Sequence, residues 1–273
     1  MSTPDETPTD PSPFANSHVT IHFSAPDFTV PSPTDVNEKV TPETTIFNWG
    51  GVKIARIAPT IAVKFGSHVT PSEAKNRDIG DYGSLFDTYI FMDFVEGQTL
   101  DKVWDGYDEG AKARIANQLK AYFHELRRIH APGYIGSVDS GPVMDPMLEY
   151  YHTRGAKTGE GPFPSLETFN NTLIDAYQLK VPKRHIKSFL SGMLSETNHQ
   201  IVFTHGDLRH ANIMVHEGSV TGILDWEFSG WYPEYWEFAK ALYVWRWQND
   251  WTDYLLRVLR PYYGGVCGSF VLG

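Results

Sequence analysis

The sequence predicts an α+β fold in which strands dominate the first part of the folded chain and helices the second. Residues 45–66 and 88–95 contain short apolar or alternating runs of the kind that form strands. Residues 111–129 instead repeat apolar side chains at the spacing of an amphipathic helix. Within the helical part, apolar runs at 213–215 and 220–224 flank a turn that contains glycine, which predicts a β-hairpin.

The composition sets limits on location and partners. With 273 residues, 41% of them hydrophobic, the chain can bury one large core or two modest ones. A formal net charge of −10 argues against a nucleic-acid partner, because phosphate backbones are bound by basic surfaces. No apolar run approaches the ~20 residues that span a bilayer. The single cysteine, Cys267, cannot form an internal disulfide. We therefore expect a cytoplasmic protein without a nucleic-acid or membrane partner.

Residues 1–45 differ in composition from the remainder of the chain. They hold eight of the 18 prolines, among serine, threonine and aspartate. Such a segment has little apolar surface to offset the entropy lost on ordering. We therefore expect residues 1–45 to be a mostly disordered N-terminal segment.

The next region, from Thr45 to Gly66, is expected to form consecutive strands. Gly50-Gly51 suits a tight turn, and strands are predicted at 52–57 and 60–65. In the second of these strands, alternation places Lys64 on the face opposite the apolar side chains. Lys64 is then either part of a solvated edge or a cation placed for a ligand.

The remaining elements follow from apolar periodicity. The strand at 88–95 ends at Glu96-Gly97 before a helix at 99–104, and this break is where two lobes could join. The helix at 111–129 carries Ile115, Leu119, Phe123, Leu126 and Ile129 on one stripe. Further helices are expected at 165–179 and 183–197, and the segment 231–260 is expected to be loop and then helix.

The hairpin is expected to bring two oxygen-bearing side chains together. Facing residues of an antiparallel hairpin have a constant sum of positions, so if Val215 faces Gly222, Asn212 faces Asp225. Their Cα atoms would then lie roughly 5 Å apart. Amide and carboxylate oxygens suit Mg²⁺, which takes one or two protein oxygens together with substrate phosphates. A surface hairpin with polar ends is the simpler interpretation, but Asp207, five residues before Asn212, adds a carboxylate at the same end.

The same residues fit a template for phosphoryl transfer. That template needs a carboxylate that orients or deprotonates a hydroxyl, oxygen ligands for a metal, and a lysine on the phosphates. His205, Asp207 and Asn212 match the catalytic-loop pattern H-R-D-x-x-x-x-N, with glycine in place of the arginine. The Ala-Val-Lys of 62–64 matches the end of the strand motif V-A-I-K, and the Asp-Trp-Glu of 225–227 stands where D-F-G would be.

On these motifs the sequence resembles the aminoglycoside phosphotransferase and choline kinase family of protein-kinase-like small-molecule kinases, in its fungal branch. HGDL at 205–208, followed by Asn212-Ile213, is similar to the catalytic loop of that family. ILDWE at 223–227 is similar to its metal-binding loop. The resemblance extends over about residues 46–260.

The resemblance implies a two-lobed, protein-kinase-like α+β fold. Residues 46–97 would form a small β-rich N-lobe with the nucleotide-binding strands and the hinge. Residues 98–273 would form a mainly helical C-lobe with the catalytic hairpin. The N-lobe is shortened, because only residues 67–87 stand where the family normally has a long helix and a further strand. The implied activity is transfer of the γ-phosphate of ATP to a hydroxyl of a small-molecule substrate.

The resemblance also implies roles for individual residues. Asp207 would be the catalytic base, and Asn212 and Asp225 would bind Mg²⁺. These three residues would form the chemical centre in the C-lobe.

The N-lobe would hold the nucleotide. Lys64 would bind the α- and β-phosphates, with Glu73 as its ion-pair partner. The backbone from Asp93 to Val95 would hold the adenine.

Two other interpretations stay open. The shortened N-lobe favours a catalytically silent kinase-like module that binds a nucleotide or a partner. A metallohydrolase would use His205, Asp207, His210 and His216 as metal ligands. The last two histidines lack the i, i+4 spacing of a helical metal site, and Asn212 would then have no role.

Overall fold

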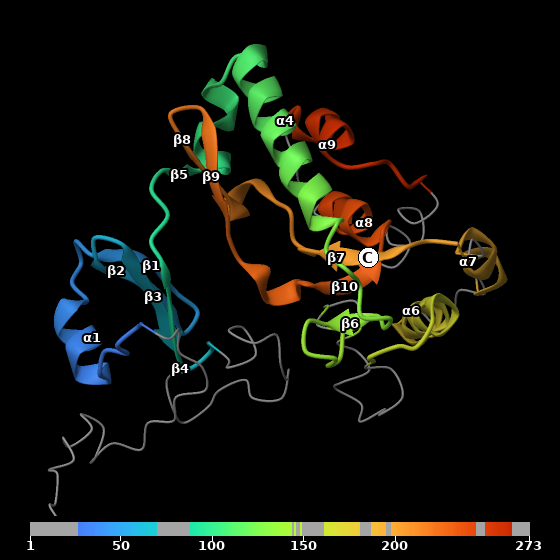
Figure 1. Ribbon diagram of the computed structural model, residues 1–273, viewed down its shortest axis with the longest axis horizontal. Coiled ribbons are helices and arrows are strands. Elements are labelled where there is room, and N and C mark those ends of the chain that lie inside the picture. The colour runs from blue at the N-terminus through green and yellow to red at the C-terminus, as the bar shows by residue number, and fades with distance from the viewer. Residues whose placement is uncertain are drawn as a thin grey trace, which may run out of the picture. The chain divides into compact units, whose positions relative to one another are not determined.

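The computed structural model describes residues 27–69, 88–143, 145, 148, 161–180, 187–194, 198–243 and 249–263 (Figure 1). The chain divides into two compact units, Met1–Gly66 with Tyr89–Phe94, and Ser67–Thr88 with Val95–Gly273. The first unit contains α1 (Pro33–Lys39), β1 (Thr45–Trp49), β2 (Val52–Ala58), β3 (Ile61–Gly66) and most of β4 (Thr88–Asp93). The second contains β5 (Gln98–Thr99), α3 (Leu100–Val103), η1 (Trp104–Gly106), α4 (Glu109–Leu126), β6 (Gly136–Ser137), α6 (Leu166–Lys180), α7 (Lys187–Met193), β7 (Ile201–Thr204), η2 (His210–Asn212), β8 (Ile213–His216), β9 (Ser219–Ile223), η3 (Trp226–Phe228), β10 (Gly230–Pro233), α8 (Trp236–Tyr243) and α9 (Trp251–Val258).

The first unit is built on a four-stranded sheet in the order β1-β2-β3-β4. The predicted tight turn between β1 and β2 is present, with positive φ angles of 61° at Gly50 and 77° at Gly51. Val63 and Phe65 are buried in the core of this unit, as their alternation in β3 predicts. Lys64 is half-buried and stands opposite Ile54 of β2.

Helix α1 lies within the segment that was expected to be mostly disordered. Its N-cap is Ser32, whose hydroxyl accepts a hydrogen bond from the Asp35 N–H, while the Asp35 carboxylate accepts one from the Ser32 N–H. Val36 is fully buried among the apolar side chains of the sheet. A capping box and one buried valine thus order residues 33–39, and proline-rich composition alone did not reveal this. Residues 1–26 lie outside the described part of the chain.

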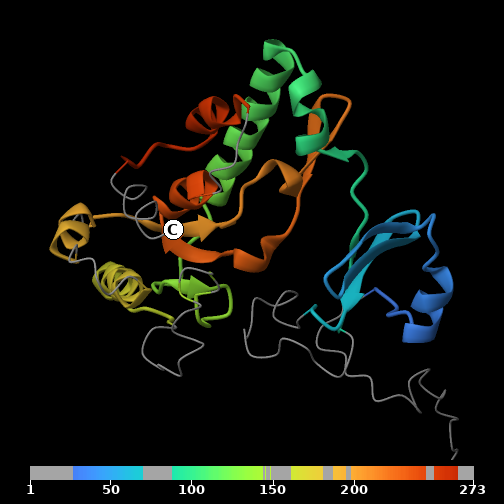
Figure 2. The same cartoon turned by 180° about the vertical axis from the view of Figure 1, so that it is seen from behind.

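The second unit has two apolar cores, and α4 lies in the larger one. Its N-cap Asp108 accepts a hydrogen bond of 2.6 Å from the Ala111 N–H. Helix α4 lies beside α9 (Figures 1 and 2). Its buried side chains are Ala111, Ile115, Ala116, Leu119 and Phe123. Ile129, predicted on the same stripe, instead lies beyond the helix end and is exposed. Neither α4 nor any other helix in the described residues is long and apolar enough to cross a membrane.

Strands β8 and β9 form the predicted hairpin. The turn has positive φ angles at both central residues, 49° at Glu217 and 73° at Gly218, as in a type I′ turn. It pairs His216 with Ser219 at the closed end of the hairpin. Strand β5 extends this hairpin to a three-stranded sheet in the order β5-β8-β9.

The predicted register of the hairpin is wrong. Gly222 does not face Val215, because a β-bulge shifts the register at that point. At the open end, the carbonyl of Asn212 accepts a hydrogen bond of 2.7 Å from the Leu224 N–H. Leu224, and not Asp225, therefore faces Asn212.

Two connecting segments, 205–212 and 224–229, link the hairpin to a second sheet in the order β6-β10-β7. The first leads from β7 to β8, and the second leads from β9 back to β10 (Figure 2). Because β7 pairs with β10 and β8 with β9, both ends of both segments are fixed by strand pairing. Asp207, Asn212 and Asp225, which are predicted to carry the chemistry, all lie on these two segments.

A hydrogen-bonded group joins the end of the described chain to Glu234, the residue that follows β10. The Tyr262 hydroxyl donates a hydrogen bond of 2.6 Å to Glu234, and the His199 ring lies 3.3 Å from the other oxygen of this carboxylate. Burial alone would raise the pKa of Glu234, but the hydrogen bonds from Tyr262 and His199 outweigh it and lower that pKa.

This lowered pKa predicts a pH dependence of stability. Glu234 binds its proton more weakly in the folded protein, so its contribution is present above the unfolded pKa and is lost as the pH falls through the folded value. Between about pH 5 and about pH 3, the free energy of unfolding of Tyr262→Phe should therefore fall less steeply than that of the wild type. Urea unfolding at a series of pH values measures both slopes.

The neighbouring, exposed Tyr263 supplies the matched control, Tyr263→Phe, which should follow the wild type. Equal slopes for Tyr262→Phe and wild type would contradict the assigned hydrogen bond.

Candidate active site

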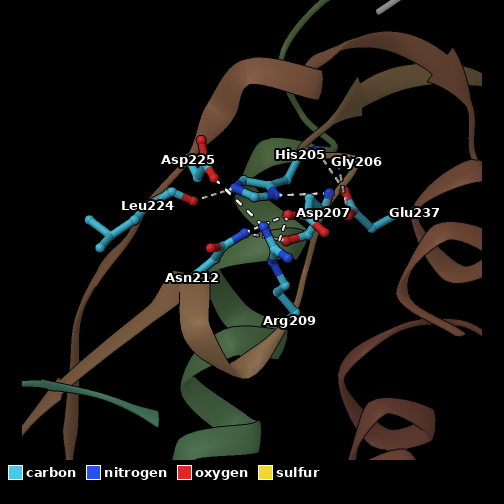
Figure 3. Close-up of polar contacts among 8 residues, drawn as sticks. All are labelled: His205, Gly206, Asp207, Arg209, Asn212, Leu224, Asp225 and Glu237. Carbon is cyan, nitrogen blue, oxygen red and sulfur yellow. Dashed lines mark hydrogen bonds and ion pairs between the residues drawn. The ribbon is translucent and has the colours of Figure 1, made fainter. Parts of the chain in front are cut away.

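His205 holds the loop that follows β7. Its side chain is fully buried, with Nε2 at 2.9 Å from the Leu224 carbonyl and Nδ1 at 3.1 Å from the backbone nitrogen of Asp207. A carbonyl only accepts and an amide N–H only donates, so Nε2 carries the hydrogen and Nδ1 accepts. The ring thus joins the two connecting segments directly beside Asp207 (Figure 3).

The buried side chain of Glu237, in α8, anchors the same loop. Its carboxylate is buried and accepts hydrogen bonds from the His205 N–H at 2.7 Å and the Gly206 N–H at 3.2 Å. Gly206 has a φ of 85°, and a Cβ at this position would lie 2.7 Å from the Phe228 carbonyl oxygen. Only glycine therefore allows the loop to pass so close to the second segment.

Arg127 gives the buried Glu237 a cationic neighbour. Burial lowers the pKa of Arg127, and attraction to Glu237 acts against that change. The guanidinium also donates a hydrogen bond to the Phe203 carbonyl in β7. The charge of Glu237 is thus compensated by two backbone N–H groups and a nearby arginine.

Asn212 fixes the side chain of Asp207. Its Nδ2 lies 2.8 Å from Asp207 Oδ2 and 2.9 Å from the Asp207 carbonyl oxygen. Asn212 is buried, and the Asp207 side chain is 12% exposed. The predicted base and one predicted metal ligand are therefore in direct contact.

Asp225 follows β9 in an unusual backbone conformation. Its φ and ψ angles of 64° and 65° are left-handed, which is uncommon for a residue other than glycine. Such conformations persist where the surrounding structure imposes them, and they cluster at functional sites. The hydrogen bonds of Leu224 to His205 and Asn212 fix the backbone directly before Asp225.

Arg209 connects the two carboxylates. Its Nε lies 2.9 Å from Asp207 Oδ2, and its Nη2 lies 3.8 Å from Asp225 Oδ2. In Figure 3 the guanidinium lies between the two acidic side chains. Asp207 and Asp225 thus belong to one electrostatic group, although they come from different segments.

The donor atoms of this group fit a hard divalent cation. Asp207 and Asp225 supply carboxylate oxygens, and Asn212 uses Nδ2 toward Asp207, which leaves its amide oxygen Oδ1 to face a cation. Two carboxylates and one amide suit Mg²⁺, which relies on substrate phosphates and water for its remaining ligands. Among the described residues, no group of three or more His, Cys, Asp and Glu side chains is placed to hold a metal.

The histidines proposed for a metallohydrolase have separate surroundings. The His205 ring is bonded on both nitrogens to the connecting segments. His210 is buried between Trp104 and Trp251, with ring centroids at 5.4 and 4.4 Å, and burial lowers its pKa to about 4. His216 lies beside the hairpin turn with an exposed side chain. The three rings therefore do not converge on one point.

The residues predicted to bind the nucleotide are described only in part. Lys64 and Asp93 belong to the first unit, where Asp93 ends β4 and is exposed. Val95 belongs to the second unit, and a Cβ at Gly222 would lie 3.1 Å from its side chain. Glu73 lies outside the described residues, so its pairing with Lys64 stays a prediction.

Two residues that hold the site were given no role on sequence grounds. Glu237 stands within the apolar run Trp236–Tyr243, and a carboxylate in such a run signals a buried, paired charge. Arg209 gives no comparable signal, because its position depends on how closely the second segment approaches the first.

The four-stranded sheet of the first unit and the hairpin with its connecting segments in the second unit are the parts of a kinase-like fold. Three solved structures share it at low sequence identity. Aminoglycoside phosphotransferase APH(4)-Ia, a thermostable mutant, matches with a TM-score of 0.54 and 14% identity, over 84% of this chain and 83% of that one. The streptomycin-ATP complex of APH(2'')-IIa matches with a TM-score of 0.51 and 9% identity, over 85% and 82% of the two chains. ADP-bound APH(2'')-Ib matches with a TM-score of 0.50 and 11% identity, over 78% and 74%.

The family assignment comes from the sequence itself. The model of the phosphotransferase enzyme family (APH) matches residues 72–267. The chain belongs to this family, as the motifs at 205–213 and 223–227 predicted. No curated protein shows significant sequence similarity to it. The placement in a fungal branch stays a prediction.

Proposed function

We propose that the protein transfers the γ-phosphoryl group of ATP to a hydroxyl group of a small molecule. Membership of the phosphotransferase family supports the reaction class. The observation that carries the proposal is the contact of Asp207 with Asn212 and Arg209, in a loop that His205 and Glu237 hold in place. A carboxylate in such a fixed loop is what in-line phosphoryl transfer requires of a protein.

Asp207 would act on the acceptor. Its Oδ2 is engaged by Asn212 and Arg209, which leaves Oδ1 to accept the hydrogen bond of the incoming hydroxyl. As the new O–P bond forms and the bond to ADP breaks, the hydroxyl proton passes to this carboxylate. Orientation of the hydroxyl is the larger part of the task, because the transition state of phosphoryl transfer is loose.

Asn212 and Asp225 would hold Mg²⁺ through the amide Oδ1 and the carboxylate. When bound, the cation neutralises charge on the phosphate oxygens. The left-handed backbone of Asp225 is held by the hydrogen bonds of Leu224, so less ordering of the backbone would be needed on binding.

The residues that the family resemblance assigns to the nucleotide would supply its contacts. Lys64 would bind the α- and β-phosphates with Glu73 as its partner, and the backbone from Asp93 to Val95 would hold the adenine. Structures of similar fold support a nucleoside triphosphate donor, since APH(2'')-IIa is in a complex with streptomycin and ATP and APH(2'')-Ib is bound to ADP. Streptomycin, which is bound in the APH(2'')-IIa complex, is not proposed as a substrate of this chain.

A direct test is an acceptor screen with Mg-ATP. The purified protein is incubated with pools of amino sugars, amino alcohols and nucleosides, and mass spectrometry detects products heavier by one phosphoryl group. A phosphorylated product and matching ADP release are expected. Binding of Mg-ATP without any product would favour the catalytically silent module, and absence of nucleotide binding would oppose both.

The metal role of Asp225 predicts a specific loss of nucleotide affinity. Asn tolerates the left-handed backbone, so Asp225→Asn removes the charge with little change of fold. We expect ADP to bind at least about tenfold more weakly in the presence of Mg²⁺, because one charged ligand of the cation is lost. Calorimetric titration of ADP, with Mg²⁺ and with EDTA, separates this effect from metal-independent binding. The exposed Asp253 in α9 provides the control Asp253→Asn. Unchanged Mg²⁺ dependence in Asp225→Asn would exclude this residue as a ligand.

A further inference from the structure

The candidate site contains a positively charged side chain, Arg209. The Arg209 guanidinium approaches Asp207 Oδ2 with Nε at 2.9 Å and Asp225 Oδ2 with Nη2 at 3.8 Å. The exposed fraction of the side chain is 42% for Arg209, against 12% for Asp207 and 26% for Asp225. The arginine, the most exposed of the three side chains, therefore places one positive charge against two negative charges.

The geometry of these contacts is that of a loose ion pair. Nε is buried and close to Asp207 Oδ2, but its N–H is not aligned for a hydrogen bond. The contact with Asp225 is also longer than a hydrogen bond. A guanidinium that forms a bidentate fork with one carboxylate would be held more tightly. Here it is divided between two carboxylates on different segments, so it can leave without breaking a well-formed hydrogen bond.

The same oxygens are those that fit a divalent cation. A cation coordinated by Asp225 would meet the positive charge of Arg209, whose Nη2 lies 3.8 Å from that carboxylate, at a distance where repulsion between charges is strong. The guanidinium of Arg209 must therefore move away when the cation binds.

We propose that Arg209 is the resident counter-ion of the active-site carboxylates and competes with the divalent cation for them. In the metal-free protein it neutralises Asp207 and Asp225 and stabilises their segments. When the cation binds, the side chain of Arg209 moves outward into solvent. The partial exposure of this side chain leaves room for that movement. The inference rests on the proposed function in one respect, because it takes the cation to be held by Asn212 and Asp225, directly beside Asp207.

This competition has a consequence for the order of binding. A free cation must displace Arg209 in return for two or three protein oxygens. A cation that arrives with a nucleotide brings phosphate ligands of its own and offsets the loss of the arginine contacts. Arg209 thereby disfavours occupation of the site by free cations and favours the metal-nucleotide complex.

The test compares Arg209→Gln with wild type by thermal unfolding, with Mn²⁺ as the only added ligand. In EDTA the variant should melt at a lower temperature than wild type, because the two carboxylates have lost their counter-ion. With increasing Mn²⁺ its melting temperature should rise more than that of wild type, in line with at least about fivefold tighter binding once a partly exposed ion pair no longer competes. Arg209→Lys, which keeps the charge but lacks the fork that spans two carboxylates, should lie between the two.

Arg128→Gln is the matched control. Arg128 is an exposed arginine in an ion pair of 2.8 Å with Glu125, so its loss changes the net charge equally in a pair that involves neither Asp207 nor Asp225. This variant should respond to Mn²⁺ as wild type does. A Mn²⁺ response of Arg209→Gln equal to or smaller than that of wild type would overturn the inference.

A double variant separates this failure from failure of the proposed function. Adding Asp225→Asn to Arg209→Gln should abolish the extra Mn²⁺ stabilisation. If the extra stabilisation survives, the cation binds elsewhere and the counter-ion role is wrong. The proposed function stands or falls on a different readout, the formation of a phosphorylated product in the acceptor screen.

Discussion

Replacing Asp207 with asparagine is expected to lower kcat for phosphoryl transfer by about 10³-fold, the size of a lost general base and hydroxyl-orienting group. The substitution keeps the shape of the side chain. Its carbonyl oxygen can still accept the hydrogen bond that Asn212 now donates to Asp207 Oδ2. The loop geometry should therefore survive, and the nucleotide KM should change much less than kcat. Steady-state kinetics with an acceptor found in the screen measure both quantities.

The control for this prediction is Asp253→Asn, the same chemical change on the exposed face of α9. It should leave kcat and KM unchanged. Transfer within about tenfold of wild type in Asp207→Asn would contradict a role for this carboxylate in the chemical step. If wild type and variant both bind Mg-ATP and neither forms product with any acceptor, the protein is the catalytically silent module.

Replacing Glu237 with alanine is expected to cost about 3 kcal/mol or more of folding free energy, because it leaves two buried N–H groups without acceptors. The His205 and Gly206 amides both point at this carboxylate from within the protein. Arg127 would in addition lose a compensating charge. These amides belong to the first two residues of the loop that carries Asp207. The kcat of the protein that remains folded should therefore also fall. Urea unfolding measures the first effect, and kinetics below the unfolding transition measure the second.

Glu237→Gln sharpens this test. An amide has one oxygen, so one of the two backbone donors would meet an NH₂ group, and the loss of stability should fall between wild type and alanine. Glu125→Ala removes an exposed glutamate from α4 and should stay within about 0.5 kcal/mol of wild type. A similarly small cost for Glu237→Ala would show that the loop does not depend on this anchor.

The hairpin shows how far sequence reasoning reaches. Apolar runs and the Glu217-Gly218 turn predicted both strands correctly, because strand pattern and turn chemistry are local properties. The register was wrong because a β-bulge shifts the pairing, and a bulge leaves no reliable mark in the apolar pattern. Asp225 nevertheless joins the site. The left-handed conformation of Asp225 and its contact with Arg209 connect it to Asp207. Asp225 does not need to face Asn212 across the hairpin for this.

The N-terminal part shows the complementary limit. The face of Lys64 in β3 follows from simple alternation and agrees with the burial of Val63 and Phe65. Helix α1 was hidden by proline-rich composition, although Ser32 and Asp35 carry its capping signal. Whether Lys64 pairs with Glu73 stays a prediction, because Glu73 lies outside the described residues.

The sequence by itself determined the family, the strands of the hairpin and the helix α4, and the spacing that makes Asp207, Asn212 and Asp225 candidates for chemistry. These conclusions rest on short-range patterns, which are legible without coordinates. Only the tertiary structure decided what holds those residues. Glu237 reaches His205 and Gly206 across more than thirty positions of sequence. Arg209 reaches Asp225 only because the pairing of β7 with β10 and of β8 with β9 holds the two connecting segments together. Contacts of this kind depend on how separate segments pack, and no local pattern records that packing.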